Sequence, residues 1–269
     1  MNILMPMAGA GSRFIEAGYK THKPIIPTTY WKNGQQYPMV VCALYDLPDY
    51  QNSNLIIIGR DFHVKDNVDK TINSYFPNST FMHIKDLTEG QASTCLLAES
   101  LINNKDELLI AGCDNGMIYN QDNFLKAKES ADVLVFTHRN HELVLKNPSA
   151  YGWCVVDDND FITSMSVKKQ ISDTPLNDHA VVATFWFKKG SIFVEAAHKM
   201  IKENDRINNE FYVDKVITHV LDLGYTAKVF QVDKYLCWGT PNDYENYENT
   251  LKYWHNFQLK DKIARELIK

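Results

Sequence analysis

Short apolar segments alternate with amphipathic segments through the first half of the chain, and this alternation is the strongest constraint on its fold. The apolar segments have the length of buried strands, whereas the amphipathic segments carry apolar residues at helical spacing. The predicted strands cover residues 2–7, 54–59, 80–84, 107–112 and 132–138, and the predicted helices cover residues 37–47, 62–76, 90–102 and 121–130. The alternation predicts an α/β fold, in which crossover helices join the strands of a mostly parallel sheet.

The second half of the chain has a different pattern. Residues 151–167 are typical of a hairpin, with two strands joined by the acidic turn at residues 157–160. Further strands are predicted at residues 180–188 and 226–233, helices at 190–203 and 210–223, and a last long helix opened by Pro241. No linker, repeat or low-complexity tract interrupts the pattern, so we expect a single α/β domain over residues 1–269.

Composition and charge exclude several classes of protein. The 269 residues carry a formal net charge of −5, which leaves no basic excess for general nucleic-acid binding. No apolar run approaches the length of a membrane span, and the apolar start lacks the basic lead-in of a signal peptide. The five cysteines form no CxxC pair, which favours reduced thiols over a disulfide framework or a zinc site. We therefore expect a cytoplasmic protein.

A glycine-rich loop follows the first predicted strand, with the sequence GAGSRF at residues 9–14. Phe14 stands where the dinucleotide fingerprint needs its last glycine, and the Walker sequence Gly-Lys-Ser/Thr is absent. Small residues still let a backbone approach an anion closely, Arg13 can fork onto phosphate oxygens, and Lys23 adds a second charge. The loop by itself is equally consistent with a surface turn that carries two solvated cations.

Five motifs in order give the loop a context. Gly9-x-Gly11-Ser12-Arg13 with Lys23-Pro24 resembles the signature of the sugar-phosphate nucleotidyltransferases, also called nucleotide-sugar pyrophosphorylases. The other motifs of this resemblance are EGQAST at 89–94, AGCDNGM at 111–117, YGWCVVDDNDFITSMSVKK at 151–169 and YLCWGTPNDYENY at 235–247. The resemblance covers nearly the whole chain. It implies a Rossmann-like domain of the glycosyltransferase-A type, with a nucleotide-binding half (1–140), an acceptor-binding half (141–240) and a C-terminal helix (241–269).

The resemblance also implies a reaction and its residues. A phosphate oxygen of a phosphorylated sugar or alcohol would attack the α-phosphate of a nucleoside triphosphate, releasing pyrophosphate and giving a nucleotide-activated sugar for polysaccharide biosynthesis. Arg13 would bind the departing phosphates, Lys23 the phosphates near the reacting centre, and Asp114 would hold Mg²⁺. The residues implied for nucleotide binding are Ala8, Gly9, Gly11, Ser12, Gly90 and Gln91. Asp114 as a turn or helix cap, and Gln91 as an exposed helix start, are the structural alternatives.

The acceptor side is implied by fewer residues. Lys168 would hold the acceptor phosphate, with Lys169 as the substitute if the register differs by one. Gly152 would bring backbone close to the sugar, and Glu210 would accept from its hydroxyls or be an acidic residue at a helix N-terminus.

Two departures from the family pattern concern the acceptor and the metal. Val167 stands where relatives often carry a glutamate before the phosphate-binding lysine, so a usual hydroxyl acceptor is missing. Cys237 stands where many relatives carry a second magnesium aspartate, and a thiol is a poor ligand for this cation. Asp233, four residues earlier, is a candidate replacement.

The motifs leave the substrates open. Gln91 suits uracil, thymine or cytosine, which weakly favours CTP, UTP or dTTP. A glycosyltransferase of the same fold is an alternative, although the Asp-x-Asp pair of such enzymes is absent at Asp114-Asn115-Gly116. A nucleotide-binding relative without catalysis is another, prompted by Cys237. His138 and His141 are interpreted as loop residues rather than a metal site, and the aromatic tail at 243–257 as a helix packed on the domain, with protein–protein contact as the weaker alternative. The sequence leaves the oligomeric state open, a homo-oligomer included.

Overall fold

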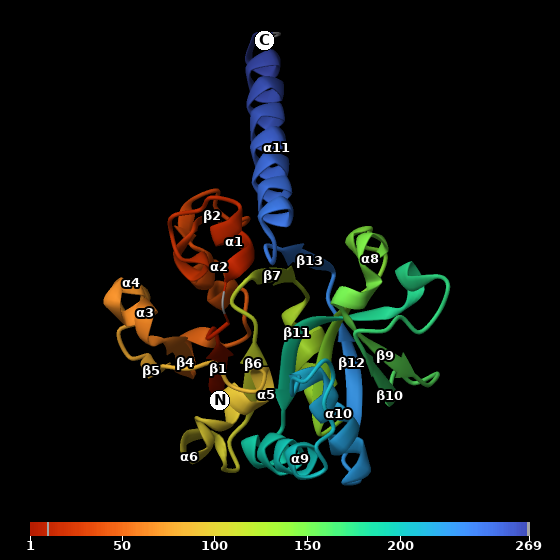
Figure 1. Cartoon of the computed structure of the whole chain (residues 1–269). Coiled ribbons are helices and arrows are strands. Elements are labelled where there is room, and N and C mark those ends of the chain that lie inside the picture. Colours follow the sequence, from red (N-terminus) through yellow and green to blue (C-terminus); the bar gives the residue numbers. More distant parts are fainter. Residues whose placement is uncertain (10, 268–269) are drawn as a thin grey trace.

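The computed structural model describes residues 1–9 and 11–267, and its centre is a large mixed sheet (Figure 1). In the described part of the chain, nine strands belong to this sheet. They are β1 (Asn2–Pro6), β4 (Asn54–Arg60), β5 (Thr80–Ile84), β6 (Leu108–Ala111), β8 (Val133–His138), β9 (Gly152–Val156), β10 (Ile162–Val167), β11 (His179–Phe187) and β12 (Ala227–Gln231). Four shorter strands form two separate ribbons, β2 (Pro27–Thr29) with β3 (Gln36–Pro38), and β7 (Asn115–Ile118) with β13 (Lys234–Cys237).

Four of the five strands predicted in the first half form one parallel side of the sheet, whereas β8 lies on the other side. β1 lies between β4 and β6 and is parallel to both, and β5 extends this side beyond β4. The other side is mixed, because β11 runs antiparallel to β6, β8 and β9, and β9 forms the expected hairpin with β10. Strands such as β1 and β6 are almost wholly apolar because helices cover both of their faces.

Helices cover both faces of the sheet. They are α1 (Ser12–Glu16), α2 (Met39–Tyr45), α3 (Asp61–Lys65), α4 (Val68–Tyr75), α5 (Gln91–Leu96), α6 (Glu99–Ile102), α7 (Gln121–Lys128), α8 (Leu143–Lys146), α9 (Gly190–Lys202), α10 (Val213–Asp222) and α11 (Pro241–Leu267). One core cluster packs α2 and α7 with parts of α1 and α4, and the other packs α5, α6, α9 and α10. None of the described helices combines the length and the apolar character needed to cross a bilayer.

Three predicted helices have different bounds. The helix expected over 62–76 is divided into α3 and α4, because Asn67 between them adopts a left-handed φ of 57°. The helix expected over 90–102 is divided into α5 and α6. The helix expected over 210–223 begins only at Val213, so Glu210 precedes it and is not in its first turn.

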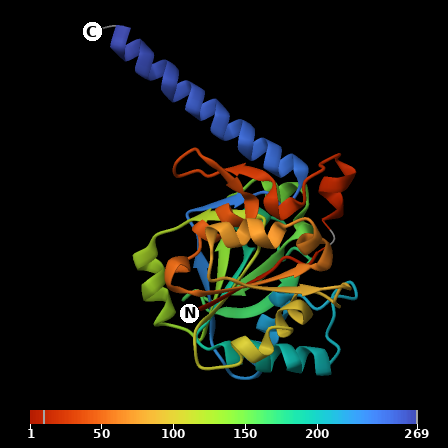
Figure 2. The same ribbon diagram turned by 90° about the vertical axis from the view of Figure 1, so that its left-hand side faces the viewer.

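The C-terminal helix α11 also differs from the prediction. Its first turns contact β2 and β13, but the rest projects away from the body of the molecule (Figures 1 and 2). The side chains from Lys252 to Lys260 are all exposed. The expectation that the whole aromatic tail packs on the domain is therefore wrong, because the body offers a surface only to the base of this helix.

Candidate active site

A cavity of about 480 Å³ opens at one edge of the sheet, beside the carboxyl ends of β1 and β6. Ligand sites of α/β proteins commonly lie at this edge, because the loops that follow parallel strands meet there. Eight of the residues predicted from the motifs line this cavity, namely Ala8, Gly9, Gly11, Lys23, Gly90, Gln91, Asp114 and Glu210. The structure thus brings together segments that are more than 200 residues apart in the chain.

The glycine-rich loop forms one wall of the cavity. Gly11 has a φ of 63°, a conformation that glycine adopts without steric cost, and it caps α1. Phe14 anchors this short helix, because it is buried and its ring lies 5.1 Å from Tyr19 and 6.3 Å from Tyr244. Arg13, beside this anchor, remains exposed at the start of α1. It does not line the cavity, but it is close enough to help lower the pKa of Asp114.

Lys23 and Asp114 form an ion pair at the wall of the cavity. The Lys23 Nζ donates to Asp114 Oδ2 at 2.5 Å and to the Gly239 carbonyl at 2.9 Å. Only 15% of the Lys23 side chain and 34% of the Asp114 side chain are exposed. Asp114 lies in the bend between β6 and β7, so of its two structural alternatives the helix cap is wrong and the turn agrees with its position. The pair connects three of the five motifs.

The pKa values of the pair reflect a balance between burial and charge. Burial by itself would lower the pKa of Lys23, but the Asp114 carboxylate more than compensates and raises it. Burial by itself would raise the pKa of Asp114, but the Lys23 ammonium lowers it below its ordinary value. Both groups are therefore charged at neutral pH. If an anionic ligand bound Lys23 in place of Asp114, the Asp114 carboxylate would be free to bind a cation.

The segment around Gly90 forms the opposite wall. Gly90 has a φ of 129°, and a Cβ there would lie 2.5 Å from the backbone nitrogen of Phe211. This close approach is held by two hydrogen bonds, from Phe211 N to Glu89 O at 2.7 Å and from Ala92 N to Phe211 O at 2.9 Å. Gln91 begins α5, as its structural alternative stated, but it is half-buried rather than exposed, and it lines the cavity.

Two of the predicted acceptor residues, Gly152 and Lys168, belong to a second group that does not line the cavity, whereas Glu210 does line it. Gly152 lies against the Asp214 carboxylate so closely that no side chain would fit there. The Lys168 Nζ donates to the Ala150 carbonyl at 2.5 Å and lies 5.3 Å from the centre of the Tyr212 ring. Burial raises the pKa of Asp214, and the nearby Lys168 offsets part of this rise.

Asp214 was not among the predicted site residues. The available signal is an acidic residue in the first turn of α10, four positions after Glu210. Burial and the Glu210 carboxylate both raise the pKa of Tyr212, whose ring also contacts Lys168. Tyr212 is therefore a neighbour of Glu210, which lines the cavity, and of the Lys168 group.

Asp233 does not lie beside Asp114, contrary to the prediction. In the β7–β13 ribbon, Cys237 is paired with Asn115 but Lys234 with Ile118, so Asp233 lies at the far end from Asp114, and it is exposed. Ser12 also lies outside the cavity wall and is exposed.

The carboxylate next to Cys237 is that of Asp243. The Cys237 Sγ lies 3.7 Å from Asp243 Oδ2, which also accepts from the Thr240 hydroxyl at 2.6 Å. The Thr240 Oγ1 in turn accepts from the Asp243 backbone nitrogen at 3.2 Å and so caps α11. Burial raises the pKa of Cys237 to about 11, so the thiol is protonated at neutral pH, and a thiol is in any case a poor ligand for Mg²⁺.

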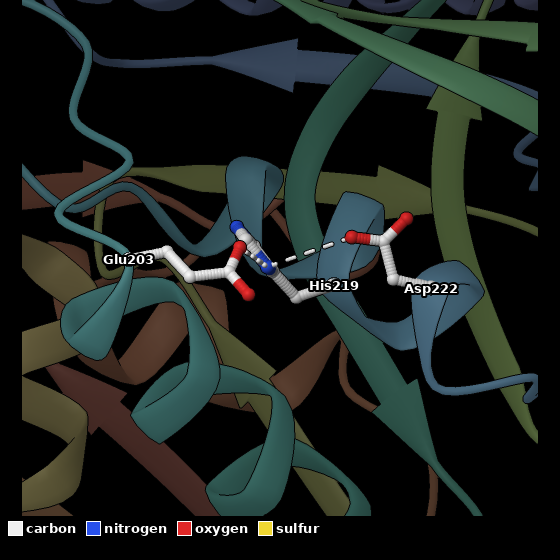
Figure 3. A group of neighbouring side chains, drawn as sticks. All are labelled: Glu203, His219 and Asp222. Atoms are coloured by element: carbon white, nitrogen blue, oxygen red, sulfur yellow. Dashed lines mark ion pairs between the residues drawn. The ribbon is translucent and has the colours of Figure 1, made fainter.

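One group of side chains elsewhere has the composition of a metal site. The carboxylates of Glu203 and Asp222 lie 3.6 Å and 3.9 Å from Nδ1 of His219, on α10 and at the end of α9 (Figure 3). The ammonium of Lys199 forms ion pairs with both carboxylates, at 2.9 Å from Glu203 and 3.0 Å from Asp222. The group is therefore an ion-pair network that joins α9 to α10. His138, which was interpreted as a loop residue, is instead buried at the end of β8.

Comparison with known proteins identifies the fold. No known family model matches the sequence, and no curated protein sequence matches it. Among solved structures, the nucleoside-diphosphate-sugar pyrophosphorylase from Vibrio cholerae RC9 is similar, with a TM-score of 0.72, 15% identity and coverage of 91% of this chain and 98% of that one. The inositol-1-phosphate CTP transferase from T. maritima gives a TM-score of 0.67 at 15% identity, covering 92% and 93% of the two chains.

A UDP-glucose pyrophosphorylase complexed with UDP-glucose is also similar. Its TM-score is 0.66 at 18% identity, and the match covers 95% of this chain and 98% of that one. The similarity therefore extends over both predicted halves and not over a nucleotide-binding segment alone. The chain has the α/β fold of the sugar-phosphate nucleotidyltransferases, a glycosyltransferase-A-like architecture.

Proposed function

We propose that this protein is a magnesium-dependent nucleotidyltransferase that joins a nucleoside triphosphate to a sugar 1-phosphate or a similar phosphorylated alcohol. The observation that carries this proposal is the Lys23–Asp114 ion pair on the wall of the cavity that the glycine-rich loop also lines. A phosphoryl-type transfer depends on positioning and charge neutralisation. It therefore needs cationic side chains, a carboxylate that can hold a metal ion, and backbone N–H groups close to the phosphates. The five free cysteines suit the reducing cytoplasm, where we place the reaction.

The reaction forms one bond and breaks another at the α-phosphorus of the triphosphate. An oxygen of the acceptor phosphate attacks this phosphorus, and the bond to the bridging oxygen breaks so that pyrophosphate leaves. Lys23 would move from Asp114 to the phosphates, and Arg13 would neutralise the departing charge. Gln91 would bind the base through its amide, with a pyrimidine favoured. Lys168 would hold the acceptor phosphate.

The chemistry of the site fits Mg²⁺. This cation prefers oxygen ligands and is commonly bound by one or two carboxylates together with substrate phosphates. Asp114 supplies one carboxylate, whose present cationic partner is Lys23. When bound, the cation would add positive charge at the phosphates. Asp233 is too far along the β7–β13 ribbon to join Asp114, so we assign Mg²⁺ to Asp114 and the triphosphate oxygens.

An assay of pyrophosphate release tests the proposed reaction. The protein is incubated with each common nucleoside triphosphate and a panel of sugar 1-phosphates and polyol phosphates. We expect release with at least one pyrimidine nucleotide, lost in Asp114→Asn and retained in Asp233→Asn as the matched control. Hydrolysis or transfer from a finished nucleotide-sugar, without pyrophosphate release from any pair, would indicate the glycosyltransferase alternative. Triphosphate binding without turnover of any pair would indicate an inactive relative.

Calorimetric titration of Mg²⁺ tests the metal assignment without turnover. If Asp114 and the phosphates hold the cation, the free protein binds it weakly and a non-hydrolysable triphosphate strengthens the binding sharply. Cys237→Ser should leave this binding nearly unchanged, because a protonated thiol is a poor ligand for Mg²⁺. Tight Mg²⁺ binding by the nucleotide-free protein, or its loss in Cys237→Ser, would contradict the assignment.

A further inference from the structure

Among the residues whose side chains the structure describes, the C-terminal helix α11 contacts the body at its base. Tyr244 donates to the Pro27 carbonyl at 2.6 Å, Tyr247 donates to the Thr29 carbonyl at 2.7 Å, and Glu248 accepts from the backbone and hydroxyl of Thr29. Beyond these contacts the helix continues to Leu267 and extends into solvent (Figure 2). At 1.5 Å per residue, its full length is about 40 Å.

The projecting part of α11 carries large apolar side chains that the described body does not cover. Tyr253, Trp254, Phe257 and Leu259 are exposed by 63%, 54%, 53% and 51%, respectively. The rings of Tyr253 and Trp254 lie 5.5 Å apart and those of Trp254 and Phe257 5.7 Å apart, so these three form one aromatic face. Most helical stability in proteins comes from packing of an apolar face, and contiguous exposed apolar surface marks an interaction site.

We propose that this aromatic face pairs with α11 of a second copy of the chain, with the two helices antiparallel. The charges along the helix support this partner. Residues 241–251 contain three acidic residues and neither lysine nor arginine, whereas residues 252–267 contain four basic and two acidic residues. An antiparallel pair places the basic end of each helix along the acidic base of the other, so the helix carries the complement of its own charge. A parallel pair would set like charges together.

The same features argue against a lipid surface as the partner. A helix that lies in a membrane interface needs one continuous apolar face opposite a charged one. At about 100° per residue, Leu259 lies on the side of the helix opposite Phe257. The acidic base of α11 would also repel anionic lipids. A homodimer uses both the local aromatic face and the change in charge along the helix.

Sedimentation equilibrium of the full chain tests this pairing. We expect a mass of twice 31.0 kDa for the wild type. Trp254→Ser/Phe257→Ser should weaken the dimer at least tenfold, whereas Leu97→Ser/Leu125→Ser should not. This control also replaces two large apolar side chains with serine, but at leucines that are 44% and 49% exposed on the body. A monomeric wild type, or a dimer that both double variants leave intact, would overturn the proposal.

A charge reversal tests the orientation. Lys252→Glu/Lys260→Glu should weaken an antiparallel dimer, because acidic ends then meet acidic bases, and high salt should reduce the difference from wild type. In a parallel pair the same variant replaces one like-charge contact by another and leaves the dissociation constant unchanged, which would refute the proposed orientation. Binding of monomeric protein to phosphatidylserine vesicles, lost in Trp254→Ser/Phe257→Ser, would overturn the proposal in favour of a membrane surface.

Discussion

Removal of the Lys23 ammonium is the change whose effect on the free energy of unfolding follows most directly from the structure. Lys23→Met keeps most of the side-chain volume but removes the hydrogen bonds to Asp114 and to the Gly239 carbonyl, at 2.5 Å and 2.9 Å. The Asp114 carboxylate then stays partly buried without a charged partner. We therefore expect the pKa of Asp114 to rise and the protein to lose stability even before any substrate is added.

The expected loss lies between the values for buried and exposed pairs. Breaking a fully buried ion pair by removing one partner costs about 3–5 kcal/mol, and exposed pairs are worth less than about 1 kcal/mol. Asp114 is 34% exposed and Lys23 15% exposed, so water hydrates part of the carboxylate. We expect Lys23→Met to lower the free energy of unfolding by about 2 kcal/mol, and Asp114→Asn by somewhat less, since the amide oxygen still accepts a hydrogen bond.

A double-mutant cycle measures the interaction itself. Urea unfolding of the wild type, both single variants and Lys23→Met/Asp114→Asn should give a coupling energy of about 1–2 kcal/mol. The coupling needs both charges. The pKa of Asp114 is lowered from 3.8 and that of Lys23 raised from 10.5, so the coupling is complete between these pH values. It is lost as the pH falls through the native pKa of Asp114 or rises through that of Lys23. A coupling energy below about 0.5 kcal/mol at pH 7 would refute the assignment of this pair.

Three further predictions concern single residues. Arg13→Ala should lower turnover at least tenfold by loss of a charge-assisted contact, with the free energy of unfolding changed by less than about 0.5 kcal/mol, and near-normal rates would remove Arg13 from the site. Burial raises the pKa of Asp46 to about 6 from 3.8, so the native state binds this proton more tightly and stability should fall by up to about 3 kcal/mol as the pH rises through this window. Asp46→Asn should flatten that part of the pH profile, and an unchanged slope would exclude Asp46 as its source. Gly90→Ala should lower the free energy of unfolding by about 2 kcal/mol or more, because its Cβ would lie 2.5 Å from the Phe211 nitrogen. Gly9→Ala is the control, since a Cβ there would have nothing within 4 Å. Equal effects of the two variants in a melting experiment would contradict the close approach of Gly90 to Phe211.

Elements whose own residues show a clear strand or helix pattern were predictable from the sequence. Elements with a weak pattern, which form mainly through pairing with a distant segment, were not. The strand predicted at 180–188 is β11 (His179–Phe187), because a long apolar run flanked by polar residues has few alternatives. β7 has the sequence Asn-Gly-Met-Ile, which is weak for a strand, and it forms through pairing with β13 more than 100 residues later. The division of α3 from α4 depends on the left-handed conformation of one asparagine, which periodicity does not reveal.

The candidate site shows the same limit. Lys23 and Asp114 were singled out by motifs, and the structure places them in contact. Asp214 was missed because its position depends on how closely α10 approaches Gly152, a distance that neither segment encodes alone. Asp233 is close to Cys237 in the sequence, but four residues of a strand span about 13 Å, so Asp233 lies far from Asp114.

The hydrogen bond from Lys23 to the Gly239 carbonyl has a consequence for synthesis of the protein. The two residues are 216 positions apart. At translation rates of roughly 5–20 residues per second, about 10–40 s separate the appearance of the lysine from that of its second partner. Throughout that interval the glycine-rich loop and its cation exist without the segment that completes them. A nascent chain should therefore acquire the β1–β4–β5 part of the sheet early, and the proposed nucleotide site only when synthesis is almost finished.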